Sequence, residues 1–358
     1  MQILETLFHE RNTALNTRRI YKRSVRYYEQ ITNHTINELL EIAETEEQEN
    51  IHWRNSTTRK HLLHYREWLY TKYNISTAKL YLTLITTVYR HFELTIPTLP
   101  YYSTQGLNKS QTITYEDYIT KDILGECLKI SKPLLQALIM FISSSGMSRI
   151  DVLNLTIADY LKATNDYHNH PESIRYAISE MQDTDIIPMF RLRRQKTGQE
   201  YYTFCSHEAT NYINAYLLTR KDTLRKNTRL FKIYGRYVNE VFGKLNDTLN
   251  LGKLPNGRNR LTPHMLRKFH ATQLAEAGMP TDHINLLQGR KLHGVAHEHY
   301  IRFNPEKIRE EYIEALPYLV ITDVNKYKTQ LQEATEENNA LKQDLTGILA
   351  RIEKLEKM

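Results

Sequence analysis

The stretch LTPHMLRKFHATQLAEAG, residues 261–278, carries a complete set of helix boundary signals. Thr262 is a residue type that caps helix N-termini, and the proline after it suits the first helical position. Gly278 predicts the end of the helix. His264 and Arg267 then share a face of the first turn, where free backbone N–H groups and the helix dipole favour an anion such as phosphate. A salt-bridged surface helix has the same pattern, so this segment alone does not decide between the two.

The composition is that of an ordinary soluble globular protein. The chain has 358 residues, of which 41% are hydrophobic and 25% charged, which is enough for two domains. The net charge of +7 permits a polyanionic partner without proving one. Cys127 and Cys205 have no metal-ligand spacing and indicate a reducing compartment without a disulfide framework. No apolar run is long enough to span a bilayer and no signal peptide is evident, so we expect a cytoplasmic protein.

Residues 1–95 are predicted to form a small helical bundle. In NTRRIYKRSVRYYEQI the apolar side is predicted to comprise Ile20, Val25, Tyr28 and Ile31, with basic residues interleaved. Such a basic surface is able to follow a phosphate backbone, although a solvated helix face is the default interpretation. Residues 96–112 lose the periodicity and collect Pro, Gly, Ser and Asn, which is typical of a linker.

A second unit is predicted from residue 113 to residue 320. It contains a β-hairpin, because apolar residues alternate on both sides of a Thr-Gly turn at residues 197–198. The alternating residues are Phe190 and Leu192 before the turn, and Tyr202 and Phe204 after it. The remainder of this unit is predicted to be helical.

The tail, residues 321–358, shows heptad spacing. Apolar residues recur every seven positions from Val324 and again three positions further on, which predicts a coiled coil. Asn338 falls at a core position, where a buried Asn favours a parallel two-stranded pairing. We expect the tail to pair protomers. The alternatives are a helix that packs its apolar stripe on the second unit, and a frayed, solvated end.

Three further segments join the opening one in a fixed order: SSSGMSRIDVLNLTIADY, RRQKTGQ and LLQGRKLHGVAHEHYIR. With them the sequence resembles the tyrosine recombinase (phage integrase) family, and most closely its archaeal virus and plasmid members. The resemblance covers most of residues 10–320. An arginine after a Gly-containing turn, a hairpin lysine, His-x-x-Arg, a further basic position and a tyrosine match the family motif. The candidate catalytic residues are Arg149, Lys196, His264, Arg267, Arg290 and Tyr300.

The resemblance implies a fold that is mainly α-helical with a small β-hairpin. Residues 1–95 correspond to a helical core-binding (SAM-like) domain and residues 113–320 to a mixed α+β catalytic domain, followed by the coiled coil. The implied partners are double-stranded DNA at specific attachment sites and further copies of the chain in a synaptic tetramer. No membrane, cofactor or metal is implied. The protein is then expected in the cytoplasm, associated with the nucleoid.

The resemblance also assigns chemical roles. Tyr300 attacks the phosphodiester and holds a 3′-phosphotyrosyl intermediate. Arg149 and Arg267 bind the non-bridging oxygens with permanently charged, planar guanidinium groups. Lys196 protonates the leaving 5′-oxygen, and His264 orients the phosphate or assists as an acid or base.

The sequence departs from the family pattern at two places. The acidic residue Asp151 lies two positions after Arg149, where the family usually has three, so Arg149 is expected to approach the phosphate from a modified turn. Arg290 stands where the family has a histidine, and Tyr300 follows it one residue later than usual. The alternatives for the histidine position are Lys291, His293 and His297.

The predicted function is site-specific DNA recombination by an integrase of a mobile element. A chromosome-dimer resolvase of the Xer type would use the same chemistry. A non-catalytic DNA-binding protein on an integrase scaffold is the alternative from another class.

Overall fold

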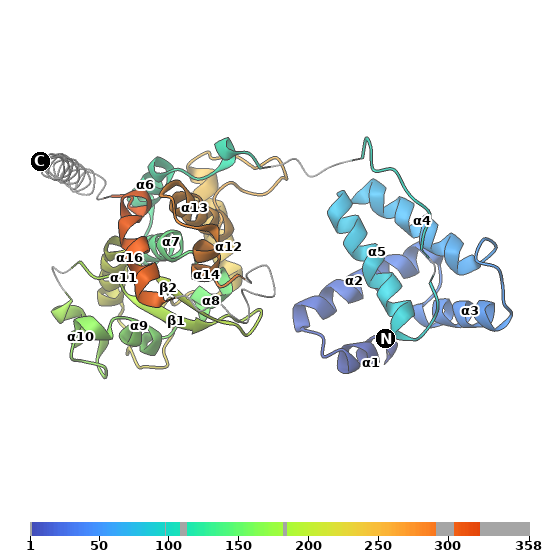
Figure 1. Cartoon of the computed structure of the whole chain (residues 1–358), viewed down its shortest axis with the longest axis horizontal. Coiled ribbons are helices and arrows are strands. Elements are labelled where there is room, and N and C mark those ends of the chain that lie inside the picture. Colours follow the sequence, from blue (N-terminus) through green and yellow to red (C-terminus); the bar gives the residue numbers. More distant parts are fainter. Residues whose placement is uncertain (1, 97, 108–112, 182–184, 291–303, 323–358) are drawn as a thin grey trace, which may run out of the picture. The chain divides into compact units, whose positions relative to one another are not determined.

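The computed structural model describes residues 2–96, 98–107, 113–181, 185–290 and 304–322. The chain divides into two compact units, Met1–Thr112 and Ile113–Met358, each with its own hydrophobic core. Figure 1 shows the two units in sequence colours.

The regular secondary structure in the described part of the first unit is all helical. Two of its helices begin at side-chain caps that the sequence supplies locally: Ser56 accepts from the backbone N–H of Arg59, and Asn74 from that of Thr77. The helices are α1 (Gln2–Glu10), α2 (Leu15–Thr32), α3 (Ile36–Gln48), α4 (Thr57–Lys72) and α5 (Ile75–His91).

The buried side of α2 agrees with the prediction at Val25 and Tyr28 but not at Ile20. Tyr21, Val25 and Tyr28 are buried, whereas Ile20 is 37% exposed. Ser24 is buried as well, and its hydroxyl donates to the Tyr81 carbonyl at 2.9 Å. Ser24 therefore occupies a core position of α2 that the pattern of apolar residues does not predict.

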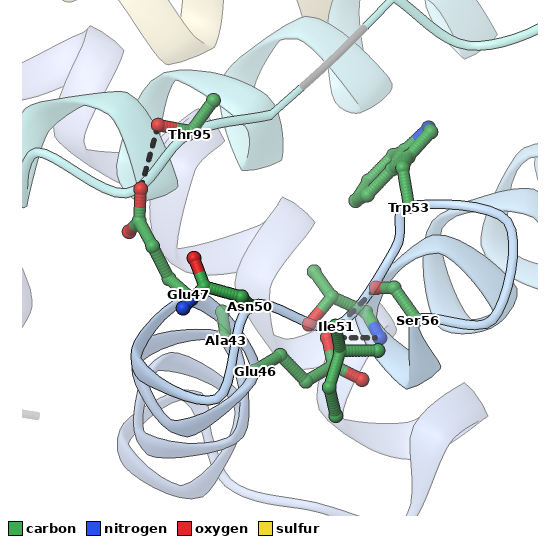
Figure 2. A pocket seen from close by; sticks show the side chains of 9 residues that line it. Ala43, Glu46, Glu47, Asn50, Ile51, Trp53, Ser56 and Thr95 are labelled. Atoms are coloured by element: carbon green, nitrogen blue, oxygen red, sulfur yellow. Dashed lines mark hydrogen bonds between the residues drawn. The ribbon is translucent and has the colours of Figure 1, made fainter.

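A pocket of about 280 Å³ lies where α3 meets the start of α4 (Figure 2). The Glu46 carboxylate accepts from the Ser56 hydroxyl at 2.7 Å and from the backbone N–H groups of Thr57 and Thr58. Glu47 accepts from the Thr95 hydroxyl at 2.8 Å. A carboxylate at a helix N-terminus satisfies free donors and opposes the positive end of the helix dipole, so Glu46 fixes the start of α4.

The first half of the predicted linker packs on this unit. Arg66 donates to the Pro100 carbonyl at 2.7 Å, and its guanidinium lies 4.8 Å from the centre of the Tyr102 ring. Tyr102 stacks on Tyr70 with ring centres 5.1 Å apart. Aromatic and cation–π contacts thus hold residues 100–102 against α4.

The second unit is built around α7, which is apolar on nearly all sides and contacts both α11 and α13 (Figure 1). Its elements are η1 (Tyr115–Asp117), α6 (Lys121–Ile130), α7 (Pro133–Ser145), α8 (Arg149–Asn154), α9 (Ile157–Ala163), η2 (Asn165–Tyr167), α10 (Ile174–Glu180), β1 (Met189–Arg193), β2 (Glu200–Phe204), α11 (His207–Thr219), α12 (Gly235–Thr248), α13 (Pro263–Glu276), α14 (Thr281–Leu287), α16 (Pro305–Glu314) and α17 (Leu316–Leu319). The mainly helical fold with one small antiparallel sheet agrees with the prediction.

The predicted hairpin is formed by β1 and β2, but the buried face of β2 differs from the predicted one. The register pairs Phe190 with Thr203 and Leu192 with Tyr201, so Tyr201 is buried and Tyr202 is only half-buried. Phe204 is also buried, because its ring packs 5.4 Å from that of Tyr312 on α16. Both faces of β2 are therefore covered, and simple alternation does not describe it.

The last described segment is anchored to this unit. The Tyr312 hydroxyl donates to the Ser144 carbonyl at 2.8 Å, and the buried Glu208 carboxylate accepts from the backbone N–H groups of Ile321 and Thr322. The predicted coiled coil, including Asn338, lies outside the described residues. Among the helices that the structure describes, none combines the length and the apolar character that a membrane span requires.

Candidate active site

A cavity of about 860 Å³ opens in the second unit among α8, α12, α13 and the end of α14. We call it the cationic cavity, because none of the described residues that line it is an Asp or Glu. Its basic lining residues are Arg149, Arg194, Lys253, Arg258, His264, Arg267, Lys268 and Arg290. Four of the predicted site residues thus meet in one place: Arg149, His264, Arg267 and Arg290.

The opening stretch folds as predicted. α13 starts after Thr262, whose hydroxyl accepts from the backbone N–H of Met265 at 3.2 Å, and Gly278 follows its end with a φ of +88°. His264 is exposed at the rim of the cavity, whereas Arg267, one turn further on, is only 6% exposed. The two side chains therefore reach the cavity at different depths.

Arg267 holds two loops together at the base of the cavity. Its guanidinium donates to the carbonyl oxygens of Gly146 at 2.8 Å and of Gln288 at 2.7 Å. The Gln288 amide in turn donates to the Arg267 carbonyl at 2.9 Å and contacts Nδ1 of His270 at 3.1 Å. Since all these groups are buried, they fix the guanidinium in one orientation.

Gly146 allows this close approach. It ends α7 with a φ of +61°, and a Cβ built there would lie 2.4 Å from Nδ1 of His270. Any side chain at this position would be strained and would separate α7 from α13. The next turn begins α8, where Arg149 is exposed and donates to the side chain of Asn239. Arg149 therefore reaches the cavity from the wall formed by α8 and α12.

Asp151 joins α8 to the hairpin. Its carboxylate accepts from the Ser148 hydroxyl at 2.7 Å and from the Gln195 backbone N–H at 3.0 Å. The Tyr201 hydroxyl lies 3.4 Å from the same carboxylate. Lys196, the next residue after Gln195, is exposed in the hairpin turn and is not among the residues that line the cavity.

Concentrated positive charge and burial shift the pKa values here. Partial burial, then the charges of Lys268 and Arg267, lower the pKa of His264. Burial, then the neighbouring Arg290 and Arg194, lower the pKa of Arg267 to about 10. Arg267 and Arg290 remain charged at neutral pH. The cations of the cavity therefore repel one another, and an anionic ligand would relieve this repulsion.

Tyr300 lies outside the described residues, as do Lys291, His293 and His297. Of the other tyrosines near the end of this unit, Tyr312 is buried, and its hydroxyl donates to the Ser144 carbonyl.

Sequence reasoning missed Arg194. It follows β1 directly, and its guanidinium donates to the Gly289 carbonyl beside the cavity. Arg191, Arg193 and Arg194 are equivalent in the sequence, because no spacing rule distinguishes one basic residue of a hairpin from another. Only the position of Gly289 in space selects Arg194.

A family comparison decides the identity of this unit. The model of the phage integrase family matches residues 118–307, more than half of the chain. The chain belongs to the phage integrase family. It is accordingly a tyrosine site-specific recombinase, and all described lining residues of the cationic cavity except Ile113 lie within the matched range. No curated protein sequence matches the chain.

Solved structures support the fold. The Tn1549 transposon integrase in complex with circular intermediate DNA superposes with a TM-score of 0.52 at 16% identity, covering 88% of this chain and 98% of that chain. A variant of the same integrase, also with a circular intermediate DNA, gives a TM-score of 0.51 at 15% identity, covering 87% and 97%. XerA recombinase is 18% identical over 87% of this chain and 95% of its own, with a TM-score of 0.35 that adds nothing to the argument.

Proposed function

We propose that this phage integrase family member cleaves and rejoins DNA at the cationic cavity through a covalent bond to Tyr300. The observation that carries the proposal is the convergence of Arg149, His264, Arg267 and Arg290 on one cavity with no carboxylate among its described lining residues. A phosphodiester is the anion that such a set of fixed donors suits.

In the proposed reaction, the Tyr300 hydroxyl oxygen forms a bond to phosphorus as the bond to the 5′-oxygen breaks. Lys196 gives the leaving oxygen a proton, and the phenol proton passes to His264, whose lowered pKa leaves it neutral and able to accept one. Arg267 and Arg149 bind the non-bridging oxygens. Attack of a 5′-hydroxyl on the phosphotyrosine reverses these steps and joins a new strand.

Arg290 lines the cavity and is the last described residue before the segment that carries Tyr300. We therefore assign it the position that a histidine takes in the family. Its guanidinium supplies a permanent charge but no acid–base group, so His264 and Lys196 carry the proton transfers.

We further propose that the first unit is a core-binding (SAM-like) domain that binds the DNA backbone. Arg19, Arg23 and Arg26 on α2 are exposed, and none of them forms an ion pair with a described carboxylate. Replacing these three residues by Ala should weaken binding to all DNA sequences alike and flatten its salt dependence. A loss confined to one sequence would instead indicate base recognition.

The biological role remains a proposal: integration or excision of an archaeal viral or plasmid element, in a tetramer paired through a coiled coil at residues 321–358. Inverted repeats that flank a spacer beside the gene, on a mobile element, would support it. Truncation after Thr322 should leave cleavage of single sites intact and weaken the paired-site complex. A single chromosomal site near the replication terminus would favour the Xer-type alternative.

A nicked suicide substrate tests the catalytic proposal. The wild-type chain should form a covalent adduct, and Tyr300→Phe should abolish it while DNA binding remains, because only a hydroxyl is removed. The matched control is Tyr318→Phe, since Tyr318 is partly exposed and lies beyond the family domain. An adduct that persists in Tyr300→Phe would overturn the assignment. No adduct with the wild-type chain would favour a non-catalytic DNA-binding protein.

Lys196 is tested separately. Lys196→Ala should cleave poorly, and a substrate with a 5′-sulfur leaving group should restore cleavage, because a thiolate leaves without a proton. The same substrate should not restore Arg267→Ala. Rescue of Arg267→Ala instead would show that the two roles are exchanged.

A further inference from the structure

Two arginines are bound by consecutive carbonyl oxygens at the end of α14. Arg267 donates to the Gln288 carbonyl, and Arg194 donates to the Gly289 carbonyl. Adjacent carbonyl groups of one chain lie within a few ångströms of each other, so the two guanidinium groups are brought close together. Arg290 is the next residue of the chain. All three arginines line the cationic cavity.

This cluster has little compensating negative charge. Asp151 is the nearby carboxylate that acts on Arg267, and it is already bound by the Gln195 backbone N–H and the Ser148 hydroxyl. The charge of Arg194 also lowers the pKa of Arg290, after burial. The cluster therefore carries more positive than negative charge among the described residues.

Arg194 retains unused donors. Of the five N–H donors of its guanidinium, the described residues engage one at Nη1. Its Nε is shielded from solvent and has no hydrogen-bond partner within the described part of the chain. A buried donor without an acceptor costs free energy, and a bound anion removes that cost.

The hairpin fixes the position of Arg194. Its backbone N–H donates to the Gln199 carbonyl and its carbonyl accepts from the Gly198 N–H, both at 2.8 Å, so it forms the base of the turn that carries Lys196. Its neighbours on β1 differ. Arg191 pairs with Glu200 at 3.2 Å, and Arg193 is exposed away from the cavity.

We propose that Arg194 is a further catalytic residue, which contacts a non-bridging oxygen of the scissile phosphate beside Arg267. The inference rests on the proposed function, since it names an additional ligand of the same phosphate. It also offers a second guanidinium for the phosphate where Arg149 stands one residue out of the family register: Arg194 supplies it from the hairpin, which Asp151 joins to α8.

The test uses the full-length chain and the nicked substrate. Arg194→Gln keeps an amide donor for the Gly289 carbonyl and removes the charge, and Arg193→Gln is the control with the same charge change on the same hairpin. We expect Arg194→Gln to form the adduct at least about 100-fold more slowly than the wild type, and Arg193→Gln to stay within about threefold.

A second substrate separates phosphate binding from a merely structural role. A methylphosphonate at the scissile position replaces one charged non-bridging oxygen by a methyl group, so a residue that neutralises that oxygen is no longer needed. The deficit of Arg194→Gln should then fall below about tenfold. A deficit that persists in full on the methylphosphonate, or cleavage by Arg194→Gln equal to that of Arg193→Gln, would overturn the proposal.

Thermal melting in inorganic phosphate, at constant ionic strength, gives a readout that does not depend on cleavage. Phosphate should stabilise the wild type and Arg193→Gln, and stabilise Arg194→Gln much less. If the wild type forms no adduct, the proposed function fails, and the melting experiment still tests whether Arg194 binds phosphate. Equal stabilisation of Arg194→Gln and Arg193→Gln by phosphate would overturn the proposed phosphate contact of Arg194. Should Arg194→Gln not fold, Arg194→Lys, which keeps a cation and a donor, replaces it, with a smaller deficit expected in every measurement.

Discussion

The pocket of the first unit and the cationic cavity of the second are both lined by charged residues, but they treat that charge differently. In the first, Glu46 accepts from a hydroxyl and two backbone N–H groups, so the chain itself satisfies the carboxylate. In the second, Arg194 and Arg267 repel each other and donate only to uncharged carbonyls within the described chain. A satisfied charge contributes to stability, whereas an excess of one sign indicates a ligand of the other sign.

The largest expected effect is at Arg267. Arg267→Ala should slow adduct formation by at least 100- to 1,000-fold, about 3–4 kcal/mol, because a preorganised donor to the transition state is lost. Arg236→Ala is the control, since Arg236 is exposed on α12 and does not line the cavity. The rate is measured with the nicked substrate. Equal rates for the two variants would mean that the excess positive charge of the cationic cavity does not serve catalysis.

The second largest expected effect is a difference between the two units in how their free energy of unfolding depends on pH. Burial, then Arg267 and Arg290, lower the pKa of His270 to about 3 from 6.5. Between these pH values the unfolded chain binds a proton that the folded chain does not, so the free energy of unfolding falls by about 1.4 kcal/mol per unit of pH decrease. Glu46 has a lowered carboxyl pKa, so its contribution is present above the unfolded value of 4.5 and is lost only as pH falls through the folded value.

Hydrogen exchange of the full chain measures this difference, because peptides from α13 and α4 report the two units separately. We expect protection of α13 to decline more steeply than that of α4 as the pH falls below about 6.5, because partial burial also lowers the pKa of His61 on α4, but without the large shift of His270. His270→Asn, which keeps an acceptor for the Gln288 amide, should remove most of that pH dependence and leave the part that comes from the lowered pKa of His264. Equal decline of both helices in the wild type would contradict the assignment.

A smaller effect is expected at Glu46. Glu46→Gln should destabilise the first unit by about 1–2 kcal/mol, because an amide cannot accept from all the donors at the start of α4. Denaturant unfolding followed by hydrogen exchange in α4 is the measurement. Adduct formation per DNA-bound molecule should be unchanged, and a slower chemical step would connect this pocket to catalysis.

The smallest effect is expected at the neighbouring carboxylate. Glu47 is exposed and accepts only from the Thr95 hydroxyl among the described residues, so Glu47→Gln should change the free energy of unfolding by less than about 0.5 kcal/mol. The same hydrogen-exchange measurement applies. A loss as large as that of Glu46→Gln would mean that overall negative charge, rather than the cap on α4, stabilises this pocket.

Local sequence signals predicted much of the scaffold. The cap at Thr262, the glycine after α13 and the hairpin depend on interactions within a few residues, so they are visible before the chain folds. Which side of a helix or strand is buried was less predictable. Ser24 and Tyr201 became core residues because of partners more than forty positions away, Tyr65 and Asp151 respectively.

The sequence by itself determined the family, the mainly helical class and which residue types stand at the motif positions, since these depend on order and spacing along the chain. Tertiary structure decided which cations share a cavity. Arg191, Arg193 and Arg194 are chemically alike and nearly adjacent, yet only Arg194 reaches the Gly289 carbonyl at the end of α14. Long-range contacts alone select among equivalent charges, because electrostatic interaction depends on separation in space and on burial, which the order of residues does not specify.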